Sequence, residues 1–272
     1  MSQADGLEPP RFDFKTPSVA RMYDYYLGGS TNFTADREVA ARALSVAPKL
    51  RSGALEIRKF LVRAVRHLAE SGIRQFVELG CGLPAQDSVH QVAQAVAPDA
   101  RVVYVDNDPL VVSHTRWLET PSTRVVQADL REPEQLLAEP ELRELIDFEQ
   151  PVAILLIAVL HQISDDDLAR HIVRTCRDAM ASGSYLAIAH AVSDVQPEVA
   201  ARLTALYQDK VGMAGPRRAN LRTRAEVAPY FDGLELVEPG LVYVPDWRPD
   251  PDSKPPPSDE PVWAFGGVAR KR

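Results

Sequence analysis

Three acidic residues close successive hydrophobic segments in the middle of the chain, and two glycines stand beside the first of them. Glu78 is followed by Gly80 and Gly82, Asp106 ends the next segment, and Asp129 follows the third. Glycine lets the backbone bend sharply and approach a ligand, and a carboxylate at the end of a parallel strand can hold ribose hydroxyls. On neighbouring strands these groups predict a nucleoside-sized site. The alternative is that Asp106 and Asp129 only cap the turns that follow them.

The glycine turn is compatible with two kinds of nucleoside cofactor. The segment 80–85, GCGLPA, keeps the alanine that a dinucleotide motif permits at its sixth position, so the pattern alone leaves an NAD-dependent oxidoreductase open. Glu78, Gly80 and Gly82 also fit the acidic-x-Gly-x-Gly turn used for S-adenosylmethionine, a cofactor without a pyrophosphate to bury.

These motifs resemble the successive cofactor motifs of class I S-adenosylmethionine-dependent methyltransferases. More narrowly, the chain resembles an actinobacterial, DUF574-like family of S-adenosyl methyltransferases without an assigned substrate, over nearly its whole length. The segments that carry this second resemblance are Arg21 to Gly29, Asn32-Phe33, Ala35 to Arg37, Val105 to Pro109 and Phe231 to Pro239.

The resemblance implies roles for the residues of the turn and the strand ends. Glu78 would orient the methionine end, the two glycines would admit it, Asp106 would bind the ribose, and Asp129 would accept from the adenine amino group beside Asn107. The full set of expected cofactor-binding residues is Tyr23, Gly28, Gly29, Asn32, Glu78, Gly80, Cys81, Gly82, Asp106, Asn107, Asp129, Leu130 and Ala158.

A histidine marks the expected acceptor side of the site. The segment Ala158 to Gln162 contains Val-Leu-His, which resembles a segment of small-molecule methyltransferases. His161 could take a proton from the acceptor, orient the acceptor, or cap the next helix. Tyr26 and His190 are the further expected acceptor-binding residues. The segment lacks the Asn-Pro-Pro-Tyr type of motif found in many enzymes that methylate nucleobases, which favours a small molecule over nucleic acid.

Two other groups of residues have a functional and a structural interpretation. Tyr23 and Tyr26 could form a cation-π wall or shape the acceptor pocket, or they could anchor a helix by burial. Gly28, Gly29 and Asn32 could contact a ligand or end that helix. Cys81 is not expected to act as a nucleophile, because methyl transfer needs no covalent enzyme intermediate, and no histidine has convincing metal-ligand spacing.

Alternating β-branched and amphipathic segments predict an α/β fold with helices covering a mostly parallel sheet. The resemblance makes this a Rossmann-like class I methyltransferase sandwich of seven strands, the last two forming an antiparallel hairpin. The expected strands are Arg74 to Leu79, Arg101 to Asp106, Arg124 to Ala128, Val152 to Ala158, Ser184 to His190, Leu234 to Glu238 and Val262 to Val268.

The chain divides into an expected N-terminal helical cap or lid, residues 1–72, and a cofactor-binding domain, residues 73–272. Three helices are expected in the cap: Pro17 to Leu27, Ala35 to Val46 and about Gly53 to Glu70. Residues 245–261 are rich in proline, which predicts an extended, mobile loop, or alternatively a ligand for a proline-binding partner.

Composition limits the class of protein. The 272 residues carry 31 basic and 38 acidic side chains, a net charge of -7, which argues against a nucleic-acid surface built on bulk positive charge. The longest apolar segment, Val152 to Leu160, is too short to cross a bilayer as a helix, and no secretory signal is visible. With two cysteines, a cytoplasmic location is expected.

We therefore expect a cytoplasmic methyltransferase that uses S-adenosylmethionine and acts on a small molecule, with no nucleic-acid or membrane partner. The sequence does not indicate an oligomeric state. A non-catalytic sensor of the same adenosyl ligand stays open as an alternative, because cofactor binding and transfer chemistry use separable residues.

Overall fold

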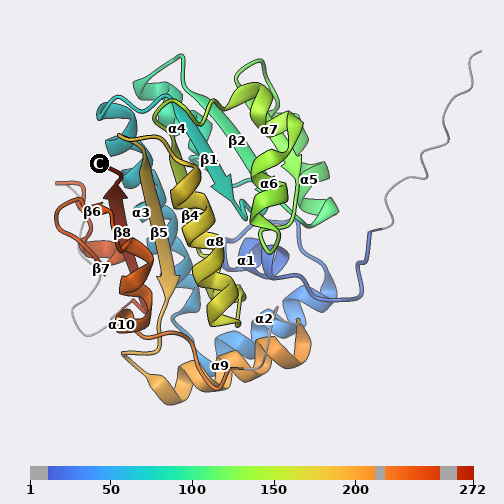
Figure 1. Ribbon diagram of the computed structural model, residues 1–272. Coiled ribbons are helices and arrows are strands. Elements are labelled where there is room, and N and C mark those ends of the chain that lie inside the picture. Colours follow the sequence, from blue (N-terminus) through green and yellow to red (C-terminus); the bar gives the residue numbers. More distant parts are fainter. Residues whose placement is uncertain (1–11, 212–217, 252–261) are drawn as a thin grey trace, which may run out of the picture.

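The computed structural model describes residues 12–211, 218–251 and 262–272, which form a three-layer α/β sandwich (Figure 1). Its sheet has the order β3-β2-β1-β4-β5-β8-β6, and β7 also pairs with β8. The strands are β1 (Gln75–Leu79), β2 (Arg101–Asp106), β3 (Thr123–Gln127), β4 (Ala153–Ile157), β5 (Tyr185–Ala191), β6 (Glu235–Leu236), β7 (Val242–Tyr243) and β8 (Ala264–Arg270).

The predicted Rossmann-like fold is confirmed. The first five strands pair in parallel, and β8 runs antiparallel between β5 and β6. The two-residue strand β7 is an eighth strand that the sequence does not predict. The chain leaves β1 toward β2 on one side and reaches β4 on the other, so the topology switches direction beside β1. Ligands of open α/β sheets bind at the carboxyl edge of such a point.

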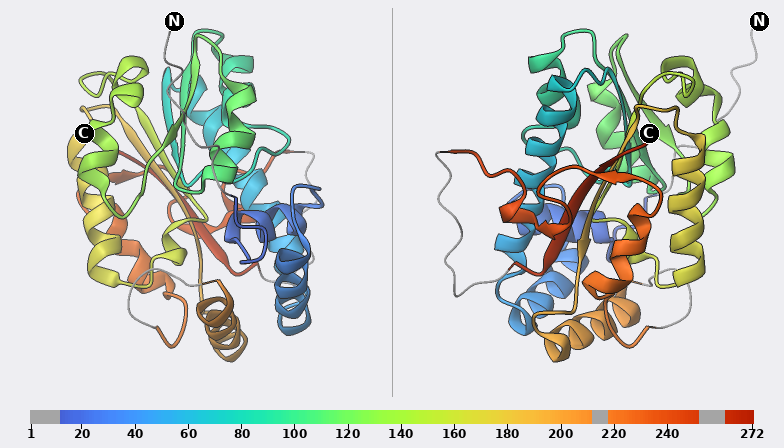
Figure 2. Two further views of the ribbon diagram at one scale, coloured as in Figure 1. Left: turned by 90° about the vertical axis from the view of Figure 1, so that its right-hand side faces the viewer. Right: turned by 60° about the vertical axis from the view of Figure 1, so that its left-hand side comes forward.

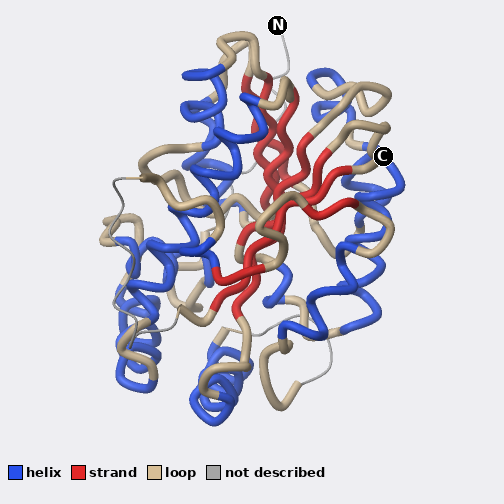
Figure 3. The backbone as a smooth tube through the Cα atoms, turned by 90° about the vertical axis from the view of Figure 1, so that its left-hand side faces the viewer, coloured by secondary structure: helices blue, strands red, loops and turns tan. Residues whose placement is uncertain are grey.

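Helices cover both faces of the sheet (Figure 3). One face packs against α3 (Leu50–Glu70), α4 (Val89–Val96) and α5 (Pro109–Thr115), and the other packs against α6 (Pro133–Ala138), α7 (Pro140–Leu145), α8 (Asp166–Ala179) and α10 (Arg224–Val227). The helices α5, α8 and α10 follow the N-cap residues Asp108, Asp165 and Thr223. Side-chain oxygens there accept from free backbone N–H groups and fix where each helix begins.

The three helices expected in residues 1–72 are present as α1 (Val19–Leu27), α2 (Thr34–Val46) and α3. A further helix that the sequence does not predict, α9 (Pro197–Lys210), shares a third hydrophobic cluster with α1 and α2. We call α1, α2 and α9 the cap (Figure 2). The inner face of α3 instead packs on the sheet, where Phe60 lies against Gly266 of β8. A helix from late in the chain therefore completes the cap, while α3 belongs mainly to the sheet layers.

The prediction of an unpacked loop over 245–261 is wrong at its beginning. The side chain of Trp247 is fully buried and meets Phe60 edge to face, with 5.4 Å between ring centroids. Arg63 donates from Nε to the carbonyl oxygen of Trp247 at 2.9 Å. Burial of this large aromatic ring ties the segment to α3. Residues 252–261 lie outside the described part of the chain. Among the described helices, none combines the length and the apolar character that crossing a bilayer would need.

Candidate active site

A cavity of about 1690 Å³ lies at the carboxyl edge of the sheet and extends beneath the cap. Single-ligand sites usually measure about 300–1,000 Å³, so this cavity has room for a cofactor and an acceptor together. Most of the sequence-predicted site residues line it: Tyr23, Tyr26, Gly28, Gly29, Glu78, Gly80, Cys81, Gly82, Asp106, Asn107, Asp129, Leu130, Ala158 and His161. Asn32 and His190 are not among the lining residues.

The glycine turn after β1 needs both of its glycines, for different reasons. Gly80 and Gly82 have φ angles of +72° and +64°, which L side chains rarely adopt. A Cβ on Gly80 would lie 2.4 Å from Cγ2 of Val159, whereas a Cβ on Gly82 would enter open space. Gly80 therefore permits close packing against the end of β4, and Gly82 leaves a cradle open toward the cavity.

Alanine substitutions should separate these two roles. Gly82→Ala should cost about 1–2 kcal/mol of unfolding free energy through backbone strain alone, and Gly80→Ala should cost more because its Cβ also overlaps Val159. Adding Val159→Ala to Gly80→Ala should recover the difference. Urea denaturation of the four proteins measures this. Equal stability of the two single variants would contradict the packing argument.

Asp106 connects the end of β2 to the glycine turn. Its Oδ2 accepts from the Gly82 N–H at 2.9 Å, and its Oδ1 accepts from the Asp108 N–H at 3.0 Å. Burial raises the pKa of this carboxyl group, and the two backbone N–H groups oppose that rise. Each carboxylate oxygen can accept more than one hydrogen bond, and Asp106 lines the cavity, so its carboxylate retains capacity to accept from a ligand.

Asp129 has a partner within its own loop. Nε of Arg131 lies 2.9 Å from both of its carboxylate oxygens, and the Arg131 guanidinium holds the pKa of Asp129 below its usual range. Hydrogen bonding from Asn107 acts in the same direction. The structure thus brings Asp129 and Asn107 together at the cavity, with the Asp129 carboxylate already paired to Arg131.

Glu78 is the most deeply buried carboxyl group of the site, with a side chain on β1 that is 5% exposed. Burial raises its pKa to about 7; Arg58 opposes this rise and the negative charge of Asp106 adds to it. Two carboxylates in one crevice form an environment that favours a cationic ligand.

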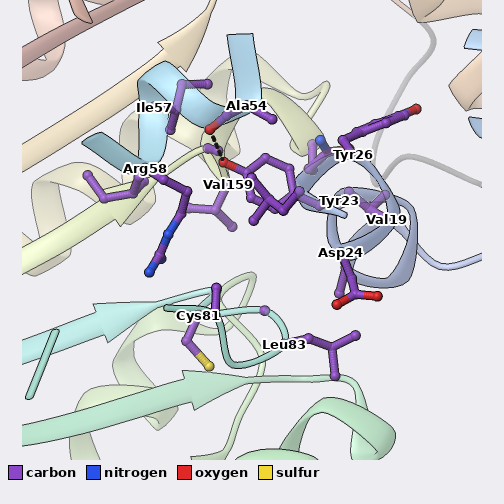
Figure 4. A pocket seen from close by; sticks show the side chains of 18 of the residues that line it. Val19, Tyr23, Asp24, Tyr26, Ala54, Ile57, Arg58, Cys81, Leu83 and Val159 are labelled. Atoms are coloured by element: carbon purple, nitrogen blue, oxygen red, sulfur yellow. Dashed lines mark hydrogen bonds between the residues drawn. The ribbon is translucent and has the colours of Figure 1, made fainter. Parts of the chain in front are cut away.

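Arg58 is a site residue that the sequence analysis misses. Its side chain extends from α3 into the cavity above Cys81 (Figure 4). The Nη2 atom of Arg58 donates to the carbonyl oxygens of Gln86 and Asp87, at 3.0 and 3.2 Å. Both carbonyl groups belong to the loop after the glycine turn. Only the packing of α3 over this loop brings the guanidinium to the site, and no local motif marks it.

The helix α1 covers the crevice from the cap side (Figure 4). The hydroxyl of Tyr23 donates to the carbonyl oxygen of Ala54 at 3.1 Å, and Ser18 Oγ donates to Oδ2 of Asp108 at 3.1 Å. Asn32 lies next to the cavity without lining it, and its Nδ2 donates to Oδ2 of Asp24 at 2.8 Å. Asn32 therefore orients Asp24, which does line the cavity.

His161 and His190 lie beside each other, with their rings in an edge-to-face arrangement. His161 lies in the turn after β4, and its Nδ1 accepts from the N–H of Ala191 at 3.4 Å. Burial lowers the pKa of His161 to about 4, and the charge of Arg222 adds to the effect. His190 is fully buried and its ring centroid lies 5.5 Å from that of His161. His190 therefore does not line the cavity, although the sequence analysis expects it to contact an acceptor. Its side chain on β5 lies behind that of His161.

Comparison with known proteins identifies the family. The sequence pattern of a family described as S-adenosyl methyltransferase matches residues 5–272. A crystal structure from Thermobifida fusca, named as an inferred methyltransferase, is 44% identical, has a TM-score of 0.89, and the match covers 98% of this chain and 99% of that one. A DUF574 family protein from Streptomyces avermitilis is 41% identical, with a TM-score of 0.90 and coverage of 96% and 100%.

A more distant structure shares the fold alone. An O-methyltransferase family protein from Burkholderia thailandensis is 13% identical, has a TM-score of 0.53, and the match covers 91% of this chain and 75% of that chain. No curated protein matches the chain. The chain belongs to the S-adenosyl methyltransferase family, and it is an enzyme that uses S-adenosylmethionine as its cofactor.

Proposed function

We propose that this enzyme methylates a small-molecule acceptor in the cytoplasm. The observation that carries the proposal is the single cavity of about 1690 Å³ that joins the carboxylate crevice to a space beneath α1 and α9. An acceptor bound there is surrounded by cap helices, which suits a small molecule better than a polymer. The two cysteines are both free, in keeping with a reducing compartment.

The residues of the crevice suit S-adenosylmethionine in charge and shape. Asp106 would hold the ribose hydroxyls, and the open cradle at Gly82 would admit the chain that links ribose to methionine. Glu78 would face the ammonium group and Arg58 the carboxylate of the methionine end, since opposite charges meet in both cases.

When bound, the cofactor supplies a methyl group that its sulfonium charge has already activated. The protein then has to hold the acceptor in line with the bond to that methyl group and to exclude water. Tyr23 and the rest of α1 close the crevice on the cap side, with Tyr23 fixed by its hydrogen bond to α3. His161 lines the same cavity, where it would orient the acceptor.

Two titrations and one transfer assay test the proposal. Isothermal titration with S-adenosylhomocysteine should show saturable binding, and NADH should show none. Incubation with methyl-labelled S-adenosylmethionine and a metabolite extract should give a labelled small product that requires the enzyme. Binding without any labelled product would favour the sensor alternative, and preferential NADH binding would favour an oxidoreductase.

Replacement of His161 separates transfer from cofactor binding. In His161→Ala, we expect the rate of labelled product formation to fall about 10-fold or more, as is typical when a group that acts on the acceptor is removed, with the dissociation constant for S-adenosylhomocysteine unchanged. His171→Ala, on the exposed part of α8, is the matched control. An unchanged rate in His161→Ala would remove His161 from the mechanism.

A further inference from the structure

Part of the hydrophobic cluster of the cap borders the cavity. Residues that pack together in this cluster also line the cavity: Tyr26, Leu27, Leu50, Leu203, Tyr207 and Trp263. We call the part of the cavity lined by these six residues the cap chamber. Protein cores are normally packed without voids of this kind, so an apolar cluster that borders a cavity indicates a place for an apolar ligand.

Aromatic side chains from both cap segments form this chamber. Tyr26 of α1 and Tyr207 of α9 join through their hydroxyl groups, 2.8 Å apart, which turns their polar ends toward each other. Trp263 lies just before β8 and belongs to the same cluster. Flat aromatic walls suit a flat ring, because stacked and edge-to-face contacts between rings are favourable.

Two of the described residues that line the cavity each carry a buried polar atom without a hydrogen-bond partner. Among the described residues, Oε1 of Gln162 and Nε1 of Trp263 are buried without a hydrogen bond, and both residues line the cavity. One is an acceptor and the other a donor. Buried polar groups in proteins are almost always paired, so a ligand that supplies both a donor and an acceptor would complete the site.

The hydrogen bond to His161 supplies a second donor. Because Nδ1 of His161 accepts from the Ala191 N–H, the proton of the neutral ring lies on Nε2. Among the described cavity-lining residues of α1 and α9, Asp24 alone is charged, and cationic lining residues lie at the start of α3 and along it: Lys49, Arg58, Lys59, Arg63 and Arg66. An acceptor whose ring lies between α1 and α9 would therefore lose water there while gaining few charged partners.

We propose that the acceptor is an uncharged aromatic compound with a ring hydroxyl, whose ring occupies the cap chamber and whose hydroxyl faces Gln162 and His161. This deepens the proposed function and rests on it. A hydroxyl group can donate to Gln162 and accept from His161 or Trp263 at the same time; a ring N–H only donates, and a thiol is weak in both roles.

The transfer step follows from this arrangement. The hydroxyl oxygen forms a bond to the methyl carbon while the methyl–sulfur bond breaks, and the electron pair of that bond stays on sulfur. The hydroxyl proton leaves the site and is taken up by bulk solvent. The products are an aromatic methyl ether and S-adenosylhomocysteine.

A matched set of small probes tests the acceptor class. The probes are 2-naphthol, 2-methoxynaphthalene, 2-naphthoate and cyclohexanol, each added to the full-length enzyme saturated with S-adenosylhomocysteine in a thermal-shift assay. We expect 2-naphthol to bind at least 10-fold more tightly than the other three, and to give its methyl ether when S-adenosylmethionine replaces the product. Absence of 2-naphthol binding, or tighter binding of 2-naphthoate or cyclohexanol, would overturn the acceptor class.

Variants locate the binding to the chamber. Leu203→Trp should fill the chamber and weaken 2-naphthol binding at least 10-fold. Arg202→Trp adds the same ring to the exposed side of α9 and should change nothing. In Gln162→Leu, the preference for 2-naphthol over 2-methoxynaphthalene should disappear; if Leu203→Trp does not fold, this variant alone decides the question, and a retained preference would overturn the proposal.

Titration with S-adenosylhomocysteine distinguishes the two levels of inference. Each folded variant should bind it with unchanged affinity, since none of the substituted residues lies in the carboxylate crevice. If the parent enzyme does not bind S-adenosylhomocysteine, the proposed function itself is wrong. Intact binding, with methylation of 2-naphthoate or cyclohexanol in place of 2-naphthol, would defeat only the aromatic acceptor.

Discussion

Asp106→Asn is expected to weaken S-adenosylmethionine binding about 100-fold. Hydrogen bonds to a charged group contribute about 1.5–3 kcal/mol each. In the variant, the two ribose hydroxyl groups would bond to a neutral amide in place of a charged carboxylate. The asparagine also presents one NH₂ group where Asp106 now accepts from backbone N–H groups on both sides, at Gly82 and Asp108. The NH₂ group then faces one of these backbone N–H groups, so that two donors oppose each other and the glycine turn is disturbed as well.

Isothermal titration of S-adenosylhomocysteine measures this effect, and circular dichroism verifies the fold. Asp178→Asn is the control, because Asp178 carries the same carboxylate at an exposed position next to Arg177. A change of less than about 3-fold in the Asp106 variant would mean that its carboxylate serves only to cap the turn.

Glu78→Gln is expected to stabilise the ligand-free protein and to weaken cofactor binding. The pKa of Glu78 is raised from an ordinary value of 4.5 to about 7, chiefly by burial. Between these values the folded state binds more protons than the unfolded state, so the contribution of Glu78 to stability falls as pH rises through this window and is constant above it. Glutamine has no charge to bury, and a pKa change of one unit corresponds to about 1.4 kcal/mol of unfolding free energy.

At pH 8 the glutamine variant should therefore be more stable than the parent by up to about 3 kcal/mol, with the difference disappearing below about pH 5. Urea denaturation across this pH range measures it. The same variant should bind S-adenosylhomocysteine at least about 10-fold more weakly, because it lacks a charge opposite the ammonium group. Glu144→Gln, at an exposed position of α7, should do neither. A variant less stable than the parent at pH 8 would contradict the burial argument.

Local sequence patterns were sufficient to predict the parallel strands and most of the residues that line the cavity at their carboxyl edge. The residues that carried the prediction are strand-end carboxylates and glycines, and their roles depend on local geometry: Gly80 and Gly82 have the left-handed φ angles that the turn requires. Asp106 follows a strand whose parallel pairing with β1 puts it beside that turn. Periodicity and turn chemistry both act over a few residues, which is why a single sequence reveals them.

Features that depend on tertiary packing were not predictable in this way. Arg58 reaches the site only because α3 lies over the loop after β1, and Trp247 is buried only because α3 offers Phe60 as a partner. The helix α9 completes the cap from far along the chain. His190 illustrates a related limit: its position at the end of β5 was correctly predicted, but not that it lies behind His161.

Cys81 lies in the glycine turn of an enzyme whose cofactor is itself a methylating agent. Burial raises the pKa of its thiol well above the ordinary value, and the negative charges of Asp106 and Glu78 add to the rise. Sulfur attacks electrophiles as the thiolate, and so a thiol that stays protonated is a poor nucleophile. The two carboxylates at this edge of the sheet thus also help to keep the neighbouring thiol protonated, and a protonated thiol beside an alkylating cofactor is slow to react.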